Sequence, residues 1–106
     1  MAQFDVHRNP GRSRTLYPYL LEVQSNFLRR SDRRVVIPLG AIGPGLQGPD
    51  PRLNPILEVE GSRVLLATQE ITNISMDALG EVVCNLRAHA DTIVGALDWL
   101  LSQGFD

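Results

Sequence analysis

The chain has 106 residues and a mass of 11.7 kDa, so we expect one domain over residues 1–106 with a single core. Apolar residues make up 43% of it and charged residues 21%, which excludes wholesale disorder. No apolar run approaches the roughly 18 residues of a membrane span, and none opens the chain after a basic segment. These features exclude membrane and secreted classes and predict a cytoplasmic protein. The lone Cys84 fits a reducing compartment and cannot form an internal disulfide.

Charge is distributed unevenly along the chain. Residues 1–52 carry a net charge of +4 and residues 53–106 a net charge of −6, and all ten basic residues are arginine. Such arginines can form a face that binds carboxylates or phosphates with the fork of the guanidinium group. They can also be ordinary solvated side chains in loops and at strand ends, which we favour for most of them. The overall charge of −2 argues against a general nucleic-acid coat protein.

The first half of the chain has the pattern of antiparallel strands. Alternation of Phe4 and Val6 with polar residues indicates a strand over residues 3–7, which an Asn-Pro-Gly turn at residues 9–11 ends. Apolar residues alternate again over residues 16–25, so these two segments predict a hairpin.

A central strand and a long loop follow. Residues 34–39 form a β-branched run that predicts a central strand. Residues 40–55 hold eight glycines and prolines, so we expect no persistent regular element there. A loop of this length is either a binding loop or a tolerated insertion.

The second half predicts a hairpin and then a helix. Residues 56–60 and 63–68 flank Gly61-Ser62, and the second of these strands is apolar on both faces, as in a central strand. From Leu86 to Leu101, apolar residues recur at spacings of three and four, which predicts an amphipathic helix capped by Asn85 or, in a shorter version, by Asp91. The fold class is therefore α+β, mainly β: a small twisted antiparallel sheet or partly open barrel with one C-terminal helix.

Candidate catalytic groups are few. The chain has no lysine for a phosphate-binding loop, and His7, Cys84 and His89 lack the paired spacing of zinc ligands, so we expect no metal or cofactor. Cys84 with His89 could act as nucleophile and base, but a cysteine in an apolar run is more often a small core residue. His7 with nearby arginines could perform acid–base ribonuclease chemistry, or it could be a solvent-facing histidine in a polar turn.

Several segments in order resemble the CcdB family of toxins from bacterial type II toxin–antitoxin modules. The resemblance spans nearly the whole chain and rests on Gln3-Phe4-Asp5-Val6, Val23-Gln24-Ser25, Arg33-Arg34-Val35-Val36-Ile37-Pro38-Leu39, Asn54-Pro55-Ile56-Leu57-Glu58-Val59, Leu66-Ala67-Thr68-Gln69, and the helix with Ile93, Ala96, Leu97 and Asp98. It implies an SH3-like sheet with a C-terminal helix, assembled as a homodimer. It also implies a non-catalytic topoisomerase poison of the kind used in plasmid maintenance. Such a toxin binds the A subunit of DNA gyrase and traps the cleaved complex.

The C-terminus differs from the family pattern. The family's gyrase contact depends on a terminal Trp-Gly-Ile, whereas this chain ends in Ser-Gln-Gly-Phe-Asp. Gly104 and Phe105 match the last two positions. Trp99 on the preceding helix can substitute for the missing tryptophan, or it can be a helix residue that packs partly on the sheet. The resemblance therefore implies Trp99, Gly104 and Phe105 as the gyrase-binding residues. Two alternatives stay open: a relic that binds antitoxin without poisoning gyrase, and a ribonuclease toxin like MazF, whose fold resembles that of CcdB.

The resemblance also implies an antitoxin of the CcdA type, a disordered segment of which folds onto the toxin. We expect the loops at residues 8–14 and 41–52 to bind it. Arg12, Arg14 and Arg52 are the expected partners of its carboxylates.

Overall fold

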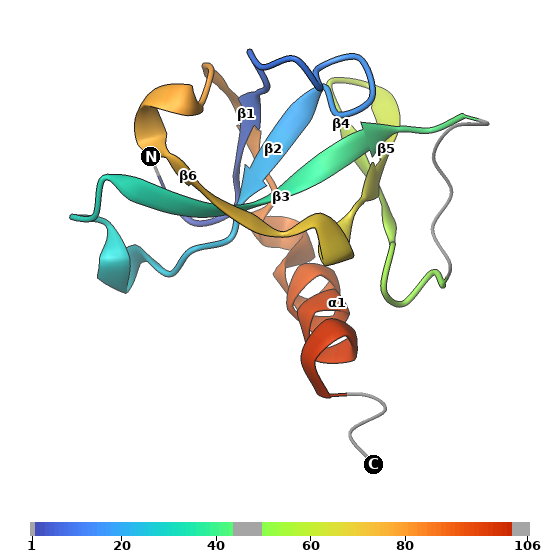
Figure 1. Ribbon diagram of the computed structural model, residues 1–106. Coiled ribbons are helices and arrows are strands. Elements are labelled where there is room, and N and C mark those ends of the chain that lie inside the picture. Colours follow the sequence, from blue (N-terminus) through green and yellow to red (C-terminus); the bar gives the residue numbers. More distant parts are fainter. Residues whose placement is uncertain (1, 44–49, 103–106) are drawn as a thin grey trace.

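The computed structural model describes residues 2–43 and 50–102, in which seven short strands form one antiparallel sheet and one α-helix follows them (Figure 1). The mainly β class predicted from the sequence is confirmed. In chain order the elements are β1 (Asp5–Arg8), β2 (Tyr19–Glu22), β3 (Arg33–Ala41), β4 (Ile56–Val59), β5 (Ser62–Leu66), β6 (Thr72–Ser75), β7 (Val82–Asn85) and α1 (Ala90–Ser102).

Strand β3 organises the sheet, whose order is β4-β5-β3-β2-β1-β7. One edge of β3 pairs with β2, and the other edge is shared by two strands. Residues 33–36 pair with β6, and residues 39–41 pair with β5. Because two strands divide one edge of β3, the sheet curls into a half-barrel (Figure 1). The predicted central position of residues 34–39 is confirmed.

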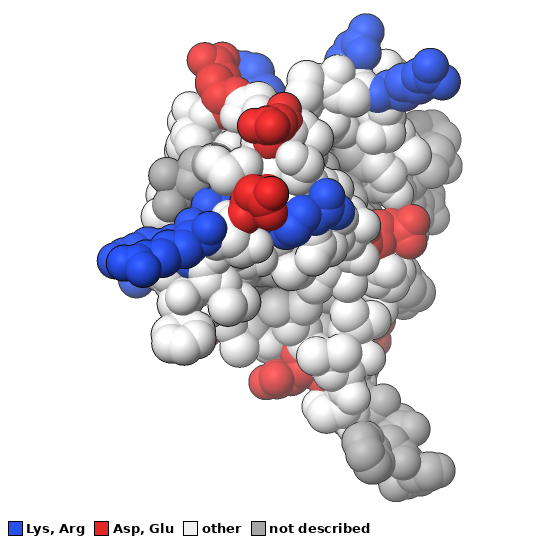
Figure 2. Space-filling model, turned by 60° about the vertical axis from the view of Figure 1, so that its left-hand side comes forward, with Lys and Arg blue, Asp and Glu red and all other residues white. Residues whose placement is uncertain are grey.

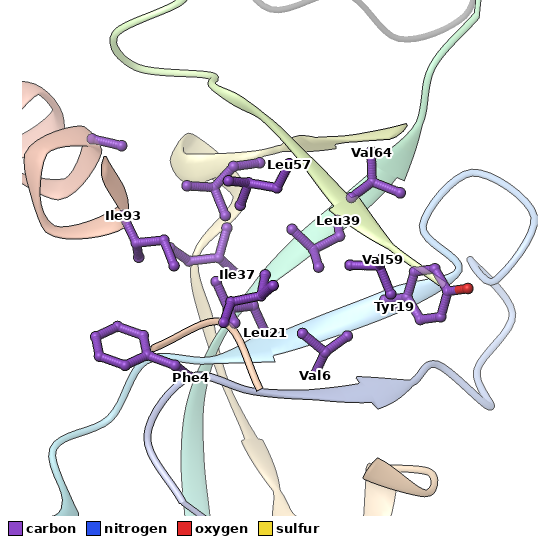
Figure 3. Packing of buried hydrophobic residues seen from close by; sticks show 13 residues of the cluster. Phe4, Val6, Tyr19, Leu21, Ile37, Leu39, Leu57, Val59, Val64 and Ile93 are labelled. Atoms are coloured by element: carbon purple, nitrogen blue, oxygen red, sulfur yellow. The ribbon is translucent and has the colours of Figure 1, made fainter. Parts of the chain in front are cut away.

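The core lies between the concave face of the sheet and α1. Leu21 and Ile37, which are paired across β2 and β3, are fully buried together with Ile93 of α1 (Figure 3). The alternation read from the sequence places these side chains on one face. Ala96, also fully buried, lets the helix approach the sheet closely. Burying each large aliphatic side chain contributes roughly 1.5–3 kcal/mol.

The β4–β5 hairpin turns one residue earlier than predicted. Glu60 and Gly61 both have positive φ angles, 52° and 79°, and Val59 pairs directly with Ser62. This two-residue turn has the backbone of the primed type, whose twist matches that of the flanking strands. The turn is therefore Glu60-Gly61 and not Gly61-Ser62. Strand β5 lies between β4 and β3, as its apolar character predicts.

The first two strands are shorter than predicted, for local reasons. Phe4 adopts a positive φ of 72°, so β1 begins only at Asp5. The amides of Leu16 and Tyr17 both donate to the carbonyl of Ser13, which keeps that segment in a turn. Strand β2 therefore begins at Tyr19 rather than at residue 16.

The helix begins later than predicted. The amide of Leu86 still donates to the carbonyl of Phe4 at 2.8 Å, so the chain continues the sheet pairing at this point. Asn85 lies one residue before the N-cap, Leu86, of a short 3-10 turn over residues 87–89, and its Oδ1 accepts from the Arg87 amide at 2.8 Å. Helix α1 follows from Ala90, four residues after the predicted start. Its apolar spacing is as predicted.

Residues 40–55 are only partly irregular. Strand β3 runs on through Gly40 to Ala41, contrary to the expectation of no regular element, because β5 and the carbonyl of Leu16 provide hydrogen-bond partners. Residues 44–49 of this loop lie outside the described part. Among the helices of residues 2–43 and 50–102, none has the length and apolar character to cross a membrane.

Candidate functional site

The exposed end of α1 carries the tryptophan that the sequence analysis assigns to gyrase binding. The helix points away from the sheet toward the C-terminus (Figure 1). Trp99 is half-buried on it, and the guanidinium carbon of Arg52 lies 3.9 Å from the centroid of its ring. The structure therefore places together two residues that the sequence analysis assigned to different partners.

Arg52 is also paired with a carboxylate. Its Nη2 lies 3.0 Å from Oδ2 of Asp50, and its backbone amide donates to Oδ1 of the same residue at 2.7 Å. The Arg52 side-chain hydrogen bond lowers the pKa of Asp50, and the same bond raises the pKa of Arg52. An acidic ligand of Arg52 must therefore compete with Asp50.

The other two arginines assigned to antitoxin binding lie in a separate part of the molecule. Arg12 and Arg14 are exposed in the β1–β2 loop, where Nη1 of Arg14 donates to the carbonyl of Gly11 at 3.1 Å. This loop lies at the top of Figure 1, whereas the segment after residue 50 lies beside α1. The three arginines thus do not form one cluster.

The predicted C-terminal contact residues cannot be placed on this fold. Gly104 and Phe105 lie outside the described residues. The described helix ends with Ser102, whose hydroxyl donates to the carbonyl of Asp98 at 2.6 Å.

His7 is a buried residue and not a solvent-facing one. Its side chain is 1% exposed on β1, with Nδ1 3.1 Å from the carbonyl oxygen of Gly80 and Nε2 3.2 Å from Oε1 of Glu22. The same carboxylate lies 3.5 Å from Nε of buried Arg34. This Nε has no hydrogen-bond partner among the described residues, so the contact is one of charge rather than a hydrogen bond. A ribonuclease would need this imidazole at its surface, and the fold encloses it.

Cys84 and His89 do not form a catalytic pair suited to nucleophilic attack. Cys84 lies in β7 opposite Val6, half-buried against the core, and this burial raises the pKa of its thiol. A raised thiol pKa reduces the reactive thiolate, opposite to the activation that a catalytic cysteine needs. His89 is exposed in the 3-10 turn before α1. In the part of the chain that the structure describes, no group of three metal-ligating side chains comes together.

A comparison with models of protein families identifies the family to which this chain belongs. The model of the CcdB protein family matches residues 3–103, nearly the full length of the chain. The chain belongs to the CcdB family. It is therefore a toxin of a toxin–antitoxin module, with an antitoxin as its partner, in a family of non-catalytic toxins. Among curated proteins, none matches the sequence significantly.

Exposed apolar side chains are candidate contacts for a partner of this toxin. On α1, Val94 and Leu101 lie seven residues apart on one flank and are 47% and 73% exposed. This flank lies on the side of α1 opposite to Trp99, because residues two positions apart on a helix do not share a face. Sequence analysis did not single them out, because they continue the same apolar periodicity that the core residues follow.

A second exposed group lies away from α1, in the β2–β3 connection. Phe27 and Leu28 form a 3-10 turn there, and Phe27 is 91% exposed. The sequence predicts residues 26–32 only as a polar connection with two arginines. Two adjacent apolar residues in such a connection were the available signal of an exposed contact.

Proposed function

We propose that this CcdB-family toxin binds the A subunit of DNA gyrase and traps the enzyme on cleaved DNA. The family match over residues 3–103 carries the proposal. The fold supports a binding role, because its candidate reactive groups, His7 and Cys84, are buried or deactivated. The toxin then acts through noncovalent contacts that stabilise the complex of gyrase with cleaved DNA, and it performs no covalent chemistry.

The gyrase contact is proposed at the end of α1, with Trp99, Gly104 and Phe105. Trp99 offers a large flat side chain whose burial in a partner contributes much binding energy at low entropic cost. Gly104 permits close approach of the backbone, and Phe105 takes the place of the family's isoleucine.

A homodimer is proposed as the active form. A chain of 106 residues buries only about two-thirds of its surface, so a second copy adds core. The exposed flank of Val94 and Leu101 supplies apolar surface for such an interface. Sedimentation at micromolar concentration is expected to give twice 11.7 kDa, and a species of 11.7 kDa alone would contradict the dimer.

Neutralisation is proposed to use Arg12, Arg14 and Arg52 as partners for antitoxin carboxylates. All three are exposed, so an extended acidic segment can reach each of them in turn. Because they are spread over the molecule, the segment must wrap around the toxin. We expect the triple alanine variant to weaken antitoxin affinity at least tenfold, which corresponds to about 1.4 kcal/mol.

DNA cleavage by gyrase tests the proposed poisoning directly. Three proteins are compared: the wild type, a chain lacking residues 104–106, and the Gln103→Trp variant. We expect cleavage with the wild type, its loss on truncation, and an increase with the added tryptophan. Absence of cleavage in all three, with antitoxin binding retained, identifies a relic and rejects the proposal. Cleavage of a long RNA that His7→Ala abolishes would instead identify a ribonuclease.

A further inference from the structure

The face of the sheet opposite to α1 holds a hollow that none of the contacts proposed above uses. Leu21 and Ile37 point toward α1 and the main core. Because side chains alternate along a strand, Leu20 and Pro38, which pair with each other, point to the other face. Together with Val36 they form the buried floor of a hollow of about 320 Å³. This floor is apolar and is fixed in the sheet.

Two preformed walls stand beside this floor. One is the β1–β2 loop, where Nδ2 of buried Asn9 donates to Oγ of Ser13 at 3.0 Å and to the carbonyl of Tyr17 at 2.8 Å. The other is β6, whose residues Thr72 and Ile74 line the hollow and are paired with β3. Because hydrogen bonds hold both walls, a ligand does not have to order them.

The hollow carries one uncompensated negative charge. Among the described residues that line it, only Glu70 is charged at neutral pH. Glu70 is exposed, and none of the ion pairs within the described part of the chain includes it. Tyr17 also lines the hollow; burial raises the pKa of its hydroxyl, and the negative charge of Glu70 raises it further. The site therefore presents a carboxylate near a neutral phenol ring.

Charge and size select the class of ligand. A carboxylate near an aromatic ring attracts a cation, because both the charge and the face of the ring favour it. A cavity of roughly 150 Å³ already holds a benzene-sized molecule, so this hollow has room for an apolar ring with a short cationic arm. Figure 2 brings the side of β6 forward, and there acidic and basic side chains are interspersed rather than gathered into one continuous surface of either sign. A polyelectrolyte has no matching surface on this side, which favours a small ligand.

We propose that this hollow binds a small organic cation, whose amine or guanidinium group pairs with Glu70 and whose apolar body lies on the floor formed by Leu20, Val36 and Pro38. Burial of the apolar body supplies affinity, and the carboxylate selects a cation and fixes its orientation. The site lies on the face of the sheet away from α1, so it is separate from the proposed gyrase contact at Trp99. The inference does not rest on the proposed function.

Titration of phenethylamine into the full-length protein, followed by the NMR shifts of the backbone amides, tests this site. We expect the largest shifts at residues that line the hollow, such as Ser13 and Thr72. Phenethyl alcohol has the same apolar body without the charge, and we expect it to bind at least threefold more weakly, as the loss of one exposed ion pair predicts. Phenylpropionate, an anion of similar size, is expected to bind more weakly still.

Two pairs of variants test the residues. Glu70→Gln is expected to weaken phenethylamine binding at least threefold, whereas Glu58→Gln, at an exposed carboxylate of β4, should leave it unchanged. Ala78→Phe places a ring at an exposed position that lines the hollow, and we expect it to abolish binding. Ala88→Phe, at an exposed alanine of another 3-10 turn, is its control. Circular dichroism confirms that each variant is folded.

The outcomes are read without gyrase or antitoxin, so they separate this inference from the proposed function. If phenethyl alcohol binds as tightly as phenethylamine, or if Glu70→Gln binds the amine as the wild type does, the hollow does not select a cation and the inference is wrong. Amide shifts confined to residues outside the hollow overturn it as well. A wild type that traps gyrase on cleaved DNA but does not bind phenethylamine overturns this inference alone.

Discussion

Arg52 stacks on Trp99, with its guanidinium carbon 3.9 Å from the centroid of the indole ring. The two residues are 47 positions apart, one in the long loop after β3 and the other near the end of α1. A cation over an aromatic face is attracted by the ring quadrupole, so this contact ties the loop to the helix. Any partner that engages Arg52 through a carboxylate therefore changes the surroundings of Trp99.

The substitution Arg52→Ala is expected to expose Trp99. The chain has no other tryptophan, so its fluorescence reports this ring alone. We expect a shift of the emission to longer wavelength and stronger quenching by acrylamide, with little change in the free energy of unfolding, because an exposed stack contributes little stability. Arg63→Ala serves as the control on an exposed arginine away from the helix. Identical quenching in Arg52→Ala and the wild type would show that the stack does not persist in solution.

The substitution Glu22→Gln is expected to destabilise the fold by roughly 3 kcal/mol. Glu22 is 3% exposed and lies between His7 and Arg34, so the neutral amide leaves the Arg34 guanidinium buried without its counter-charge. Urea denaturation measures the change, with Glu58→Gln at an exposed position of β4 as the control. If the free energy of unfolding falls no further than in the control, then water or backbone carbonyls already compensate the buried charge of Arg34.

Two glycine-to-alanine substitutions are expected to act in opposite directions. A Cβ at Gly80 would lie 2.6 Å from the carbonyl oxygen of Arg8, a backbone atom that cannot move alone, so Gly80→Ala should cost about 1–3 kcal/mol. A Cβ at Gly95 on α1 meets nothing within 4 Å, so Gly95→Ala should stabilise the helix by up to about 1 kcal/mol. Thermal melting compares both with the wild type. A Gly80→Ala protein with the same melting temperature as the wild type would contradict the close approach of residue 80 to β1.

Acid is expected to weaken the fold partly through Glu60. The hydroxyl of Tyr19 donates to its carboxylate at 2.7 Å and Arg8 pairs with it at 2.9 Å, and these contacts lower the pKa of Glu60 below its usual 4.5. Because the pKa is lower in the folded state, this carboxylate stabilises the fold above about pH 4.5. The contribution is lost as the pH falls through the folded pKa.

Melting curves of the wild type and Glu60→Gln between pH 3 and pH 7 test this dependence. The variant should lose less stability than the wild type on acidification. Glu58→Gln, on the same strand pair, should keep the slope of the wild type. The same dependence of melting temperature on pH in all three proteins would show that the pKa of Glu60 does not differ between the folded and unfolded states.

The sequence by itself determined the class of fold and most of its elements. Alternating apolar residues place Tyr19 and Leu21 on the same face of β2, the one that joins the main core, because side chains alternate across a strand. The spacing of Ile93 and Ala96 likewise defines the buried side of α1. These signals are local, so they can be read without knowing what the elements pack against. The boundaries at Tyr19 and Ala90 were less accessible from the apolar pattern. A local turn on the Ser13 carbonyl sets the first, and the hydrogen bond from the Leu86 amide to the distant Phe4 carbonyl delays the second.

Only the tertiary structure decided the surroundings of the functional candidates. His7 is enclosed because the chain returns at Gly80 and Glu22 lies on the neighbouring strand, and neither contact has a sequence signature. The stacking of Arg52 on Trp99 arises in the same way, from the path of a loop over a helix. Such contacts join residues far apart in the chain, and whether a polar side chain is buried or exposed depends on what folds over it.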